Sequence, residues 1–352
     1  SFFSRRQYPQ ANMGCCCSTS TKRWEEWEAK MPEMKGKVVA ITGCTSGTGL
    51  VLAECVARKG AKVFLLNRKS TRADDALEAV KMSATGEAPV AIECDLMSFA
   101  NVKAAAEQLA KDCKESGIDV LVNNAGIMGF PDKATEDGCD QQMQTNHLSH
   151  FLLTALCMPM LEVAASKNGE ARIVNHSSAA RVMKDMGNKL EAKYLDKNGG
   201  NLGGNSSEMF KGPQFQRYQQ TKLANVVFTY ALHRKLKAKG SKIKALVAHP
   251  GVCMDTKLMA YTVDKDKGGV KAPPLPMCCI KKVMKTQSQE DATIGILYCT
   301  CSPDAKTGEF FGPLGKGGGT GKHDESEYSG KVGLLKKEPF ADEEAETLLW
   351  EV

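Results

Sequence analysis

Short runs of β-branched and apolar residues alternate with longer amphipathic stretches between residues 37 and 311. The short runs have the length and composition of buried strands, and the longer stretches carry apolar residues three and four positions apart, as helices do. Strict alternation of the two is typical of parallel strands joined by crossover helices. The pattern therefore predicts an α/β fold, a single doubly wound domain with a seven-stranded, mainly parallel sheet and helices on both faces.

The predicted domain covers residues 36–312, and no internal repeat or second core is visible in the sequence. The expected strands are 38–42, 62–66, 90–93, 120–123, 172–176, 244–248 and 309–311. The expected helices are 48–59, 73–83, 101–113, 141–163, 215–239 and 288–301. Each helix carries one apolar face for packing on the sheet.

The two ends of the chain lack this pattern. Residues 1–35 are predicted to be a flexible N-terminal segment, and residues 313–352 a Gly/Lys-rich connector followed by a C-terminal helix from residue 340. Trp24 and Trp27 either rest at a membrane interface or cap the main domain. Met13, Gly14 and Ser18 fit a myristoylation pattern, with cysteines at 15–17 for palmitoylation. N-terminal acylation at a membrane surface and an internal methionine in a flexible tail both stay open.

Composition excludes several classes of protein. With 42% apolar and 25% charged residues over 352 positions, the chain is neither disordered, collagen-like nor a disulfide miniprotein. The net charge of +6 is spread along the chain, so no nucleic-acid partner is expected. Fourteen irregularly spaced cysteines favour free thiols in the cytoplasm. The apolar run 151–160 is too short to cross a bilayer, so no transmembrane helix is expected, and the oligomeric state is left open.

A glycine-rich turn follows the first expected strand and leads directly into a helix. Gly43, Gly47 and Gly49 are separated by three residues and one residue, with Thr45, Ser46 and Thr48 between them. Glycines at such a turn let the backbone approach a pyrophosphate, which the free N–H groups at the helix N-terminus then bind. The order strand, turn, helix favours a dinucleotide site over a simple flexible turn.

The second expected strand ends at Asn67, Arg68 and Lys69, where a protein that prefers NAD usually carries an acid. Two cations at this position attract the extra phosphate of NADP. The sequence therefore favours NADP(H) over NAD(H), with a solvated surface pair as the alternative.

Tyr218 and Lys222 lie one helical turn apart in an expected helix. Reduction of a carbonyl requires a hydride donor and a proton donor tuned toward neutral pH. We expect the ammonium of Lys222 to lower the pKa of the Tyr218 phenol. Taken alone, a Tyr and a Lys at this spacing are a weak signal, because such pairs arise by chance on ordinary helices.

The motifs together resemble the short-chain dehydrogenase/reductase family. They occur in the family's order: Thr42-Gly43-x-x-x-Gly47-x-Gly49, Asp95-Leu96, Asn123-Asn124-Ala125-Gly126, Asn146, Ser178, Tyr218-x-x-x-Lys222 and Pro250-Gly251. The local sequence around Asn146, Tyr218 and Pro250 is most similar to that of the retinol dehydrogenase and WW-domain oxidoreductase branch. The resemblance implies a Rossmann sheet, a nicotinamide cofactor and hydride transfer between carbon and a carbonyl or alcohol.

The resemblance also implies residue roles. Tyr218 would act as general acid/base, Lys222 would hold the nicotinamide ribose, Ser178 would fix the substrate oxygen, and Asn146 would support a proton-relaying water. Ser178 is chosen over Ser177 because the second serine is the catalytic one in relatives. The residues and the resemblance together place the cofactor against Gly43, Thr45, Ser46, Gly47, Thr48, Gly49, Asn67, Arg68, Asp95, Leu96, Asn123, Ala125, Gly126, Tyr218, Lys222, Pro250, Gly251 and Thr256.

No metal site is expected. The histidines at 147, 150, 176 and 249 fall on different elements, and the family uses none of them catalytically, so packing or capping roles are favoured. Cys278-Cys279 and Cys299-x-Cys301 lack the two-residue gap of a structural zinc pair.

The chain departs from the family between Ser178 and Tyr218, which are 40 positions apart where relatives usually have about a dozen. We expect the insertion, about 183–216, to border the substrate mouth. A variable region at about 253–285 corresponds to the substrate lid, and its apolar residues favour a small lipophilic carbonyl or alcohol. They are Met254, Leu258, Met259, Tyr261, Pro273, Pro274, Leu275 and Met277.

Two other functions stay open at this point. One is a non-catalytic NADP-binding protein that signals or scaffolds at a membrane. The other is an enzyme that resembles the protochlorophyllide reductases, which share part of the same local sequences. The presence of all four catalytic residue types argues against a protein without activity.

Overall fold

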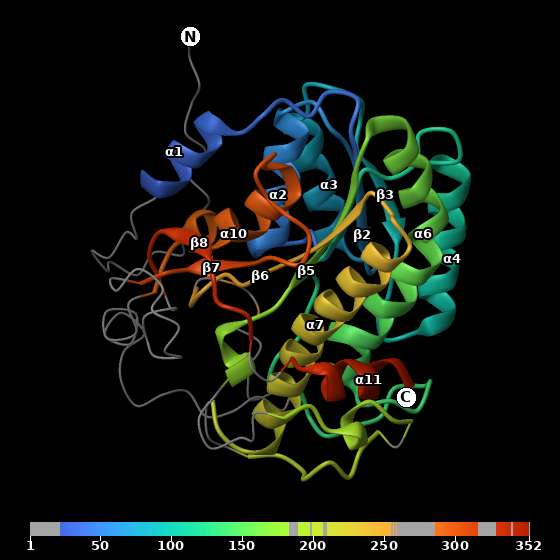
Figure 1. Ribbon diagram of the computed structural model, residues 1–352, viewed down its shortest axis with the longest axis vertical. Helices are drawn as coiled ribbons and strands as arrows, with labels where there is room; N and C mark the ends of the chain where they lie inside the picture. Colours follow the sequence, from blue (N-terminus) through green and yellow to red (C-terminus); the bar gives the residue numbers. More distant parts are fainter. Residues whose placement is uncertain are drawn as a thin grey trace.

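The computed structural model describes residues 22–182, 189–197, 199–206, 210–254, 256, 258, 286–315, 329–338 and 341–351. Within these residues one sheet runs in the order β3-β2-β1-β4-β5-β6-β7-β8 (Figure 1). The strands are β1 Val38–Thr42, β2 Lys62–Asn67, β3 Val90–Glu93, β4 Val120–Asn123, β5 Ala171–His176, β6 Ile243–Ala248, β7 Phe310–Pro313 and β8 Val332–Leu334. The strand order reverses between β1 and β4, which places the topological switch point at their carboxyl ends.

Side chains alternate across the central strands. Along β1, Val38 and Ala40 join the apolar cluster on one face of the sheet, while Val39 and Ile41 join the cluster on the other. Every residue of β1 is buried because helices cover both faces. This continuous burial explains why the parallel strands read as uninterrupted apolar runs in the sequence.

The sheet has eight strands rather than the seven predicted. The additional strand, β8, pairs antiparallel with β7, with Phe311 opposite Leu334 and Pro313 opposite Val332. The residues of β8 fall in the predicted connector, because a Val-Gly-Leu segment beside a glycine-rich stretch has too few residues to show alternation.

Nine α-helices within the described residues form the two outer layers. They are α1 Lys22–Lys30, α2 Gly47–Arg58, α3 Thr71–Ser83, α4 Phe99–Asp112, α5 Gln141–Met143, α6 Ser149–Asn168, α7 Pro213–Ala238, α10 Gln289–Cys301 and α11 Glu343–Glu351. Helices α4, α6 and α7 cover one face of the sheet, and α2, α3 and α10 cover the other (Figure 1). The predicted doubly wound architecture is therefore confirmed.

The helix predicted over 141–163 is interrupted. A π-helical turn, Gln144–Leu148, lies between α5 and α6, and α6 continues to Asn168. By length and composition the run Gln141–Asn168 could cross a membrane, but half of its most apolar window is buried. Helix α6 packs on α4 and the sheet, as a core helix of this fold does.

Both ends of the described chain pack on the domain. The backbone N–H of Trp24 donates to Asp291 of α10 at 3.0 Å, and the ring of Trp27 contacts that of Tyr298 edge-on at 5.2 Å. The prediction of a flexible segment over 1–35 is therefore wrong for Lys22–Lys30, and the tryptophans cap the domain. At the other end, the predicted helix begins at Glu343 and packs on α7.

Several predictions fall outside the described residues. The acylation pattern at 13–18, most of the lid, and residues 183–188, 198 and 207–209 of the insertion belong to this group. The described part of the insertion includes a 3₁₀ turn, Ala192–Tyr194, and its Leu190, Tyr194 and Leu195 join the core.

Candidate active site

The glycine-rich turn brings three backbone segments into close contact. Gly43 has φ +75°, and a Cβ there would stand 2.7 Å from the Cα of Ala125. A Cβ on Gly49 would stand 2.2 Å from the carbonyl oxygen of Gly43. Only glycine allows this packing, and α2 begins inside the turn at Gly47, so its first N–H groups lie beside it. The predicted residues Thr45, Ser46 and Thr48 are half-buried in the same turn.

Asn124 holds this turn, although the motif pattern did not single it out. Its side-chain amide donates to the carbonyl oxygens of Thr42 at 2.9 Å and Gly43 at 3.2 Å. Its Oδ1 accepts from the Thr48 hydroxyl at 3.1 Å and lies 2.9 Å from Nδ1 of His176. Asn124 therefore links β1, α2 and the end of β5.

Asn123 points the other way. Its Nδ2 donates to Thr154 at 3.0 Å and to Asn175 at 2.9 Å, and the side chain is 1% exposed. The structure does not bring this side chain to the glycine turn, so any contact of Asn123 with a cofactor would be made by its backbone. Asn124, the residue after β4, is the one whose side chain faces the turn.

The end of β2 lies beside the turn as predicted. Asn67 Oδ1 accepts from the backbone N–H of Cys44 at 2.7 Å, while its buried Nδ2 has no hydrogen-bond partner among the described residues. Arg68 and Lys69, the next two residues, are exposed. A buried amide and two cations thus border the place where strand two ends.

Asp95 and Leu96 follow β3 and shape the neighbouring loop. Asp95 accepts from the backbone N–H of Met97 at 2.9 Å, and the Leu96 carbonyl accepts from the Ser149 hydroxyl at 2.7 Å. These bonds tie the loop after β3 to the start of α6.

The π-helical turn places Asn146 next to the end of β4. Its amide donates to the Ile127 carbonyl at 2.9 Å and the Thr221 hydroxyl at 3.0 Å, and its Oδ1 accepts from the Ile127 N–H at 2.8 Å. A Cβ on Gly126 would stand 3.3 Å from both Asn146 Oδ1 and Lys222 Nζ. The structure therefore brings Asn146, Gly126 and Lys222 together.

Ser178, Tyr218 and Lys222 lie together around the same point. The Ser178 hydroxyl is hydrogen-bonded to the Tyr218 phenol. Lys222 Nζ lies 5.7 Å from the centre of the Tyr218 ring and donates to the His176 carbonyl at 3.2 Å. Ser177, by contrast, donates to the Lys222 carbonyl at 2.7 Å and supports the helix. The choice of Ser178 over Ser177 agrees with this geometry.

The protonation of this group differs from the expectation. Burial raises the pKa of Tyr218 to about 12, and the hydrogen bond from Ser178 opposes that rise. Burial lowers the pKa of Lys222 to about 8. The phenol pKa therefore lies above its ordinary value and not below it as expected, because desolvation of the phenolate outweighs the hydrogen bond from Ser178.

Two histidines support the site from behind. His150 lies 2.9 Å from the Thr42 hydroxyl and 3.1 Å from the Asn146 carbonyl oxygen. His147 lies 3.0 Å from Asn225 Oδ1, with its ring against that of Phe228. Burial lowers the pKa of His147 to about 4 and that of His150 to about 3, so both rings are neutral at physiological pH.

The loop after β6 closes toward the glycine turn. Gly251 has φ +69°, its N–H donates to His249 Nδ1 at 3.2 Å, and the Pro250 carbonyl accepts from Gln287. A Cβ on Gly47 would stand 3.5 Å from Cγ2 of Thr256. Thr256 therefore lies at the glycine turn.

Apolar side chains surround the Tyr218 ring. Met128, Phe215 and Met254 form a buried cluster with it, separate from the two clusters of the sheet. Four partly buried residues pack against this cluster: Ala180, Phe210, Val252 and Leu258. The contributions come from the loop after β4, the insertion and the first residues of the lid, so the two variable regions meet at the phenol.

Arg217, the residue before Tyr218, anchors the insertion. Its fully buried guanidinium lies 3.3 Å from Asp140 and 3.7 Å from Asp132, and donates to the Gly204 carbonyl at 2.8 Å. Asp132 in turn accepts from the N–H groups of Leu202 and Gly204. Burial raises the pKa of Asp140 to about 6 in spite of two backbone hydrogen bonds and Arg217.

Comparison with known proteins gives a consistent match. Residues 37–190 match the model of the short chain dehydrogenase family. Retinol dehydrogenase 14 from Mus musculus is 34% identical over 291 residues, which cover 79% of this chain and 78% of that protein. The chain belongs to the short-chain dehydrogenase/reductase family. Polyprenol dehydrogenase from Homo sapiens is 31% identical over 64% of this chain, and the matched part spans 63% of its length.

A Schizosaccharomyces pombe oxidoreductase of undefined activity is also similar, 36% identical over 66% of this chain and 64% of its own length. The chain thus spans somewhat under two thirds of several relatives that it matches. Among solved structures, an uncharacterized protein from Mycobacterium paratuberculosis aligns with a TM-score of 0.65 and 28% identity, covering 92% of this chain and 94% of that one.

The residues of this short-chain dehydrogenase/reductase fit a dinucleotide. The glycines at 43 and 49 leave a cradle that a Cβ would fill, and the unpartnered amide of Asn67 lies at its edge. A nicotinamide dinucleotide of the kind used by the family would lie over the turn, with its reactive end toward Tyr218 and Lys222.

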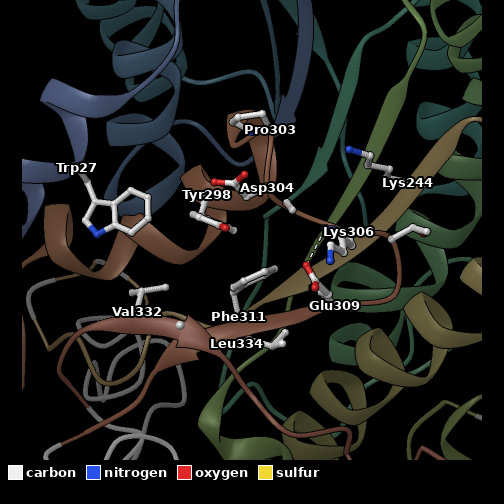
Figure 2. A pocket seen from close by; sticks show the side chains of 13 residues that line it. Trp27, Lys244, Tyr298, Pro303, Asp304, Lys306, Glu309, Phe311, Val332 and Leu334 are labelled. Carbon is white, nitrogen blue, oxygen red and sulfur yellow. Dashed lines mark hydrogen bonds between the residues drawn. The ribbon is translucent and has the colours of Figure 1, made fainter.

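An open cavity of about 810 Å³ lies elsewhere, at the β7 and β8 edge of the sheet. Figure 2 shows Trp27, Tyr298 and Phe311 around it, with Lys244 and Lys306 on its rim. It contains none of the predicted site residues. Tyr218, by contrast, is buried under the apolar side chains of its own cluster.

Proposed function

We propose that the protein is an NADP(H)-dependent oxidoreductase that interconverts a carbonyl and an alcohol on a lipophilic substrate. The observation that carries this proposal is the apolar cluster around the Tyr218 phenol, which combines a proton-transferring group with water-excluding walls. The bound nicotinamide would supply or accept the hydride. All remaining steps belong to residues of this chain.

Tyr218 exchanges the proton with the substrate oxygen. With its pKa raised to about 12, the phenol is protonated at physiological pH and is set to donate in the direction of carbonyl reduction. The Ser178 hydroxyl fixes the orientation of that phenol and of the oxygen that it protonates. Lys222 places a positive charge beside the ring, so that the phenolate formed after donation is stabilised.

The nature of the substrate is inferred from the walls of the site and from relatives. Methionine and phenylalanine side chains from the loop after β4, the insertion and the lid present no charge to the phenol. Two similar proteins are named a retinol dehydrogenase and a polyprenol dehydrogenase. A substrate with a long apolar body and one carbonyl or hydroxyl group fits these walls.

The decisive experiment replaces the phenol. Tyr218→Phe should lower turnover of a panel of retinoid, steroid and fatty aldehydes by about 100-fold or more, because proton transfer is lost. NADPH binding, measured by fluorescence titration, should stay within about twofold. Tyr298→Phe is the control, since Tyr298 packs on Trp27 and Phe311 away from the site. Unchanged turnover in Tyr218→Phe would contradict the assignment.

The preference for NADP rests on Arg68 and Lys69, the exposed cations at the end of β2. Arg68→Asp should weaken NADPH binding by about tenfold or more, the loss expected for a charge-assisted contact, and leave NADH binding unchanged or improved. Arg72→Asp, four residues further on the exposed face of α3, is the control. An NADPH to NADH affinity ratio equal to that of the wild type would remove Arg68 from the proposal.

A further inference from the structure

The turn that carries Ser178 is joined to the C-terminal part of the chain by a buried ion pair. Arg181 lies in the 3₁₀ turn Ala179–Val182, and its Nε is 2.8 Å from Oε2 of Glu338, four residues after β8. Both side chains are 1% exposed. The two residues are 157 positions apart in the sequence, so the contact exists only in the completed fold.

The guanidinium also contacts the backbone of the serine itself. Arg181 Nη1 donates to the Ser178 carbonyl at 3.3 Å, and the Arg181 N–H donates to the same oxygen at 3.2 Å. The Ser178 hydroxyl accepts from the Ala180 N–H at 3.1 Å. The turn is thus fixed from its carbonyl side by Arg181 and from its hydroxyl side by its own backbone.

Other contacts hold Arg181 in place. Its guanidinium lies 4.6 Å from the centre of the Phe310 ring on β7, and its carbonyl accepts from the Gln219 amide, the residue after Tyr218, at 3.3 Å. The Glu338 N–H donates to the hydroxyl of Tyr230, further along α7. The pair of Arg181 and Glu338 therefore contacts Ser178 directly and contacts Tyr218 through its neighbour Gln219.

Stability alone does not account for this arrangement. Removing two charges from water is unfavourable, and well-packed apolar side chains in their place are often as stable or more stable. A guanidinium held by a carboxylate differs from an apolar pair in one respect, since it directs an N–H at a chosen oxygen. In this fold that oxygen belongs to Ser178.

We propose that Arg181 and Glu338 are positioning residues that seat the Ser178 hydroxyl against the Tyr218 phenol, so that the C-terminal segment contributes to the catalytic geometry. The proposal rests on the oxidoreductase function proposed above. Neither residue touches the reacting atoms; they act through the turn at Ser178.

The test compares Glu338→Gln and the apolar double variant Arg181→Met/Glu338→Met with the wild type. Both should lower kcat by about 10- to 100-fold, the effect of a small misplacement, while KM and the NADPH dissociation constant stay within about twofold. The double variant should keep its wild-type melting temperature. Because the Ser178 hydrogen bond lowers the phenol pKa, the pH profile of kcat for alcohol oxidation should shift to higher pH.

Arg234→Gln is the matched control. Arg234 pairs with Glu343 and Glu346 and so holds the same C-terminal segment, but it has no contact with the Ser178 turn. Its kcat and pH profile should equal those of the wild type. A double variant with wild-type kcat and pH profile would overturn the proposal, as would an equal loss of kcat in Arg234→Gln.

Hydrogen exchange separates this proposal from the proposed function. Exchange in the peptide that covers residues 177–182 should be faster in the double variant than in the wild type or Arg234→Gln, and this readout needs no substrate. If the wild type reduces no aldehyde of the panel but exchange rises, the oxidoreductase function fails and the seating of the turn is supported. Unchanged exchange overturns the seating, whatever the activity.

Discussion

Burial acts in opposite directions on the two ionisable groups at the centre of the site. It raises the pKa of the Tyr218 phenol and lowers that of the Lys222 ammonium, so each group is shifted toward its neutral form. Burial of the Lys222 ammonium lowers the stability of the fold, and the same burial places a cation beside the phenol. The consequence is measurable, because the two states of Lys222 respond to pH.

Lys222→Met should raise the free energy of unfolding at pH 7. The Lys222 pKa falls from 10.5 to about 8 on folding, so the unfolded chain binds more protons between these values. The destabilising effect of the ammonium is complete below pH 8 and is lost as the pH rises toward 10.5. The gain should therefore be on the order of 1 to 3 kcal/mol at pH 7 and much smaller at pH 10 in urea unfolding.

Lys239→Met, at the exposed end of α7, is the control for this comparison and should give the same small change at both values of pH. An equal gain for Lys222→Met at pH 7 and pH 10 would show that the ammonium is not destabilised by burial.

Sequence patterns single out the candidate catalytic residues because the chemistry proposed for them depends on spacing. Tyr218 and Lys222 are one helical turn apart, and Gly43 and Gly49 are required by the close backbone contacts of the turn. The side chain of Asn124, and not that of Asn123, holds the glycine turn; both stand in one motif, and the motif alone does not tell the two side chains apart. The raised pKa of Tyr218 depends on packing by distant segments, which no local pattern contains.

Helices and strands that are long and buried agree with the prediction from sequence periodicity. Elements whose formation depends on tertiary contacts do not. The parallel strands and the long helices were predicted within a few residues. The π-helical turn before α6 and the short strand β8 were not, because the first depends on how Asn146 fits beside β4 and the second on pairing with β7. The described part of the insertion is anchored by a buried cation, Arg217, which a charge pattern alone does not distinguish from a surface residue.

Arg217→Met should destabilise the insertion and the fold. It would leave Asp132 and Asp140 buried without their cation and remove the bond to the Gly204 carbonyl. The free energy of unfolding should fall by about 3 to 5 kcal/mol in urea, and proteolysis within residues 199–206 should become faster. Lys193→Met, which removes an exposed ion pair with Glu191 in the same insertion, should change stability by less than about 0.5 kcal/mol. Equal effects of the two variants would contradict the anchoring role.

On the scale of the whole molecule, both ends of the described chain close onto the doubly wound domain. Helix α1 packs beside α10, and α11 packs beside α7 on the opposite face of the sheet (Figure 1). Trp350 of α11 contacts the rings of Phe151 and Phe228 at 4.9 and 5.9 Å, with Lys235 over its face. The C-terminal helix is therefore part of the core rather than an appendage.

Trp350→Ala should lower the free energy of unfolding by about 2 kcal/mol, because a half-buried indole and its ring contacts are lost. Thermal unfolding measures the change, and Met82→Ala, at an exposed position of α3, serves as the control with an effect below about 0.5 kcal/mol. A melting temperature of Trp350→Ala equal to that of the control would show that α11 adds nothing to the fold.

The pair between Arg181 and Glu338 has a consequence for biosynthesis. A ribosome makes the serine turn long before it makes the carboxylate that seats it, so the Rossmann sheet can assemble on a nascent chain whose active site is still unfinished.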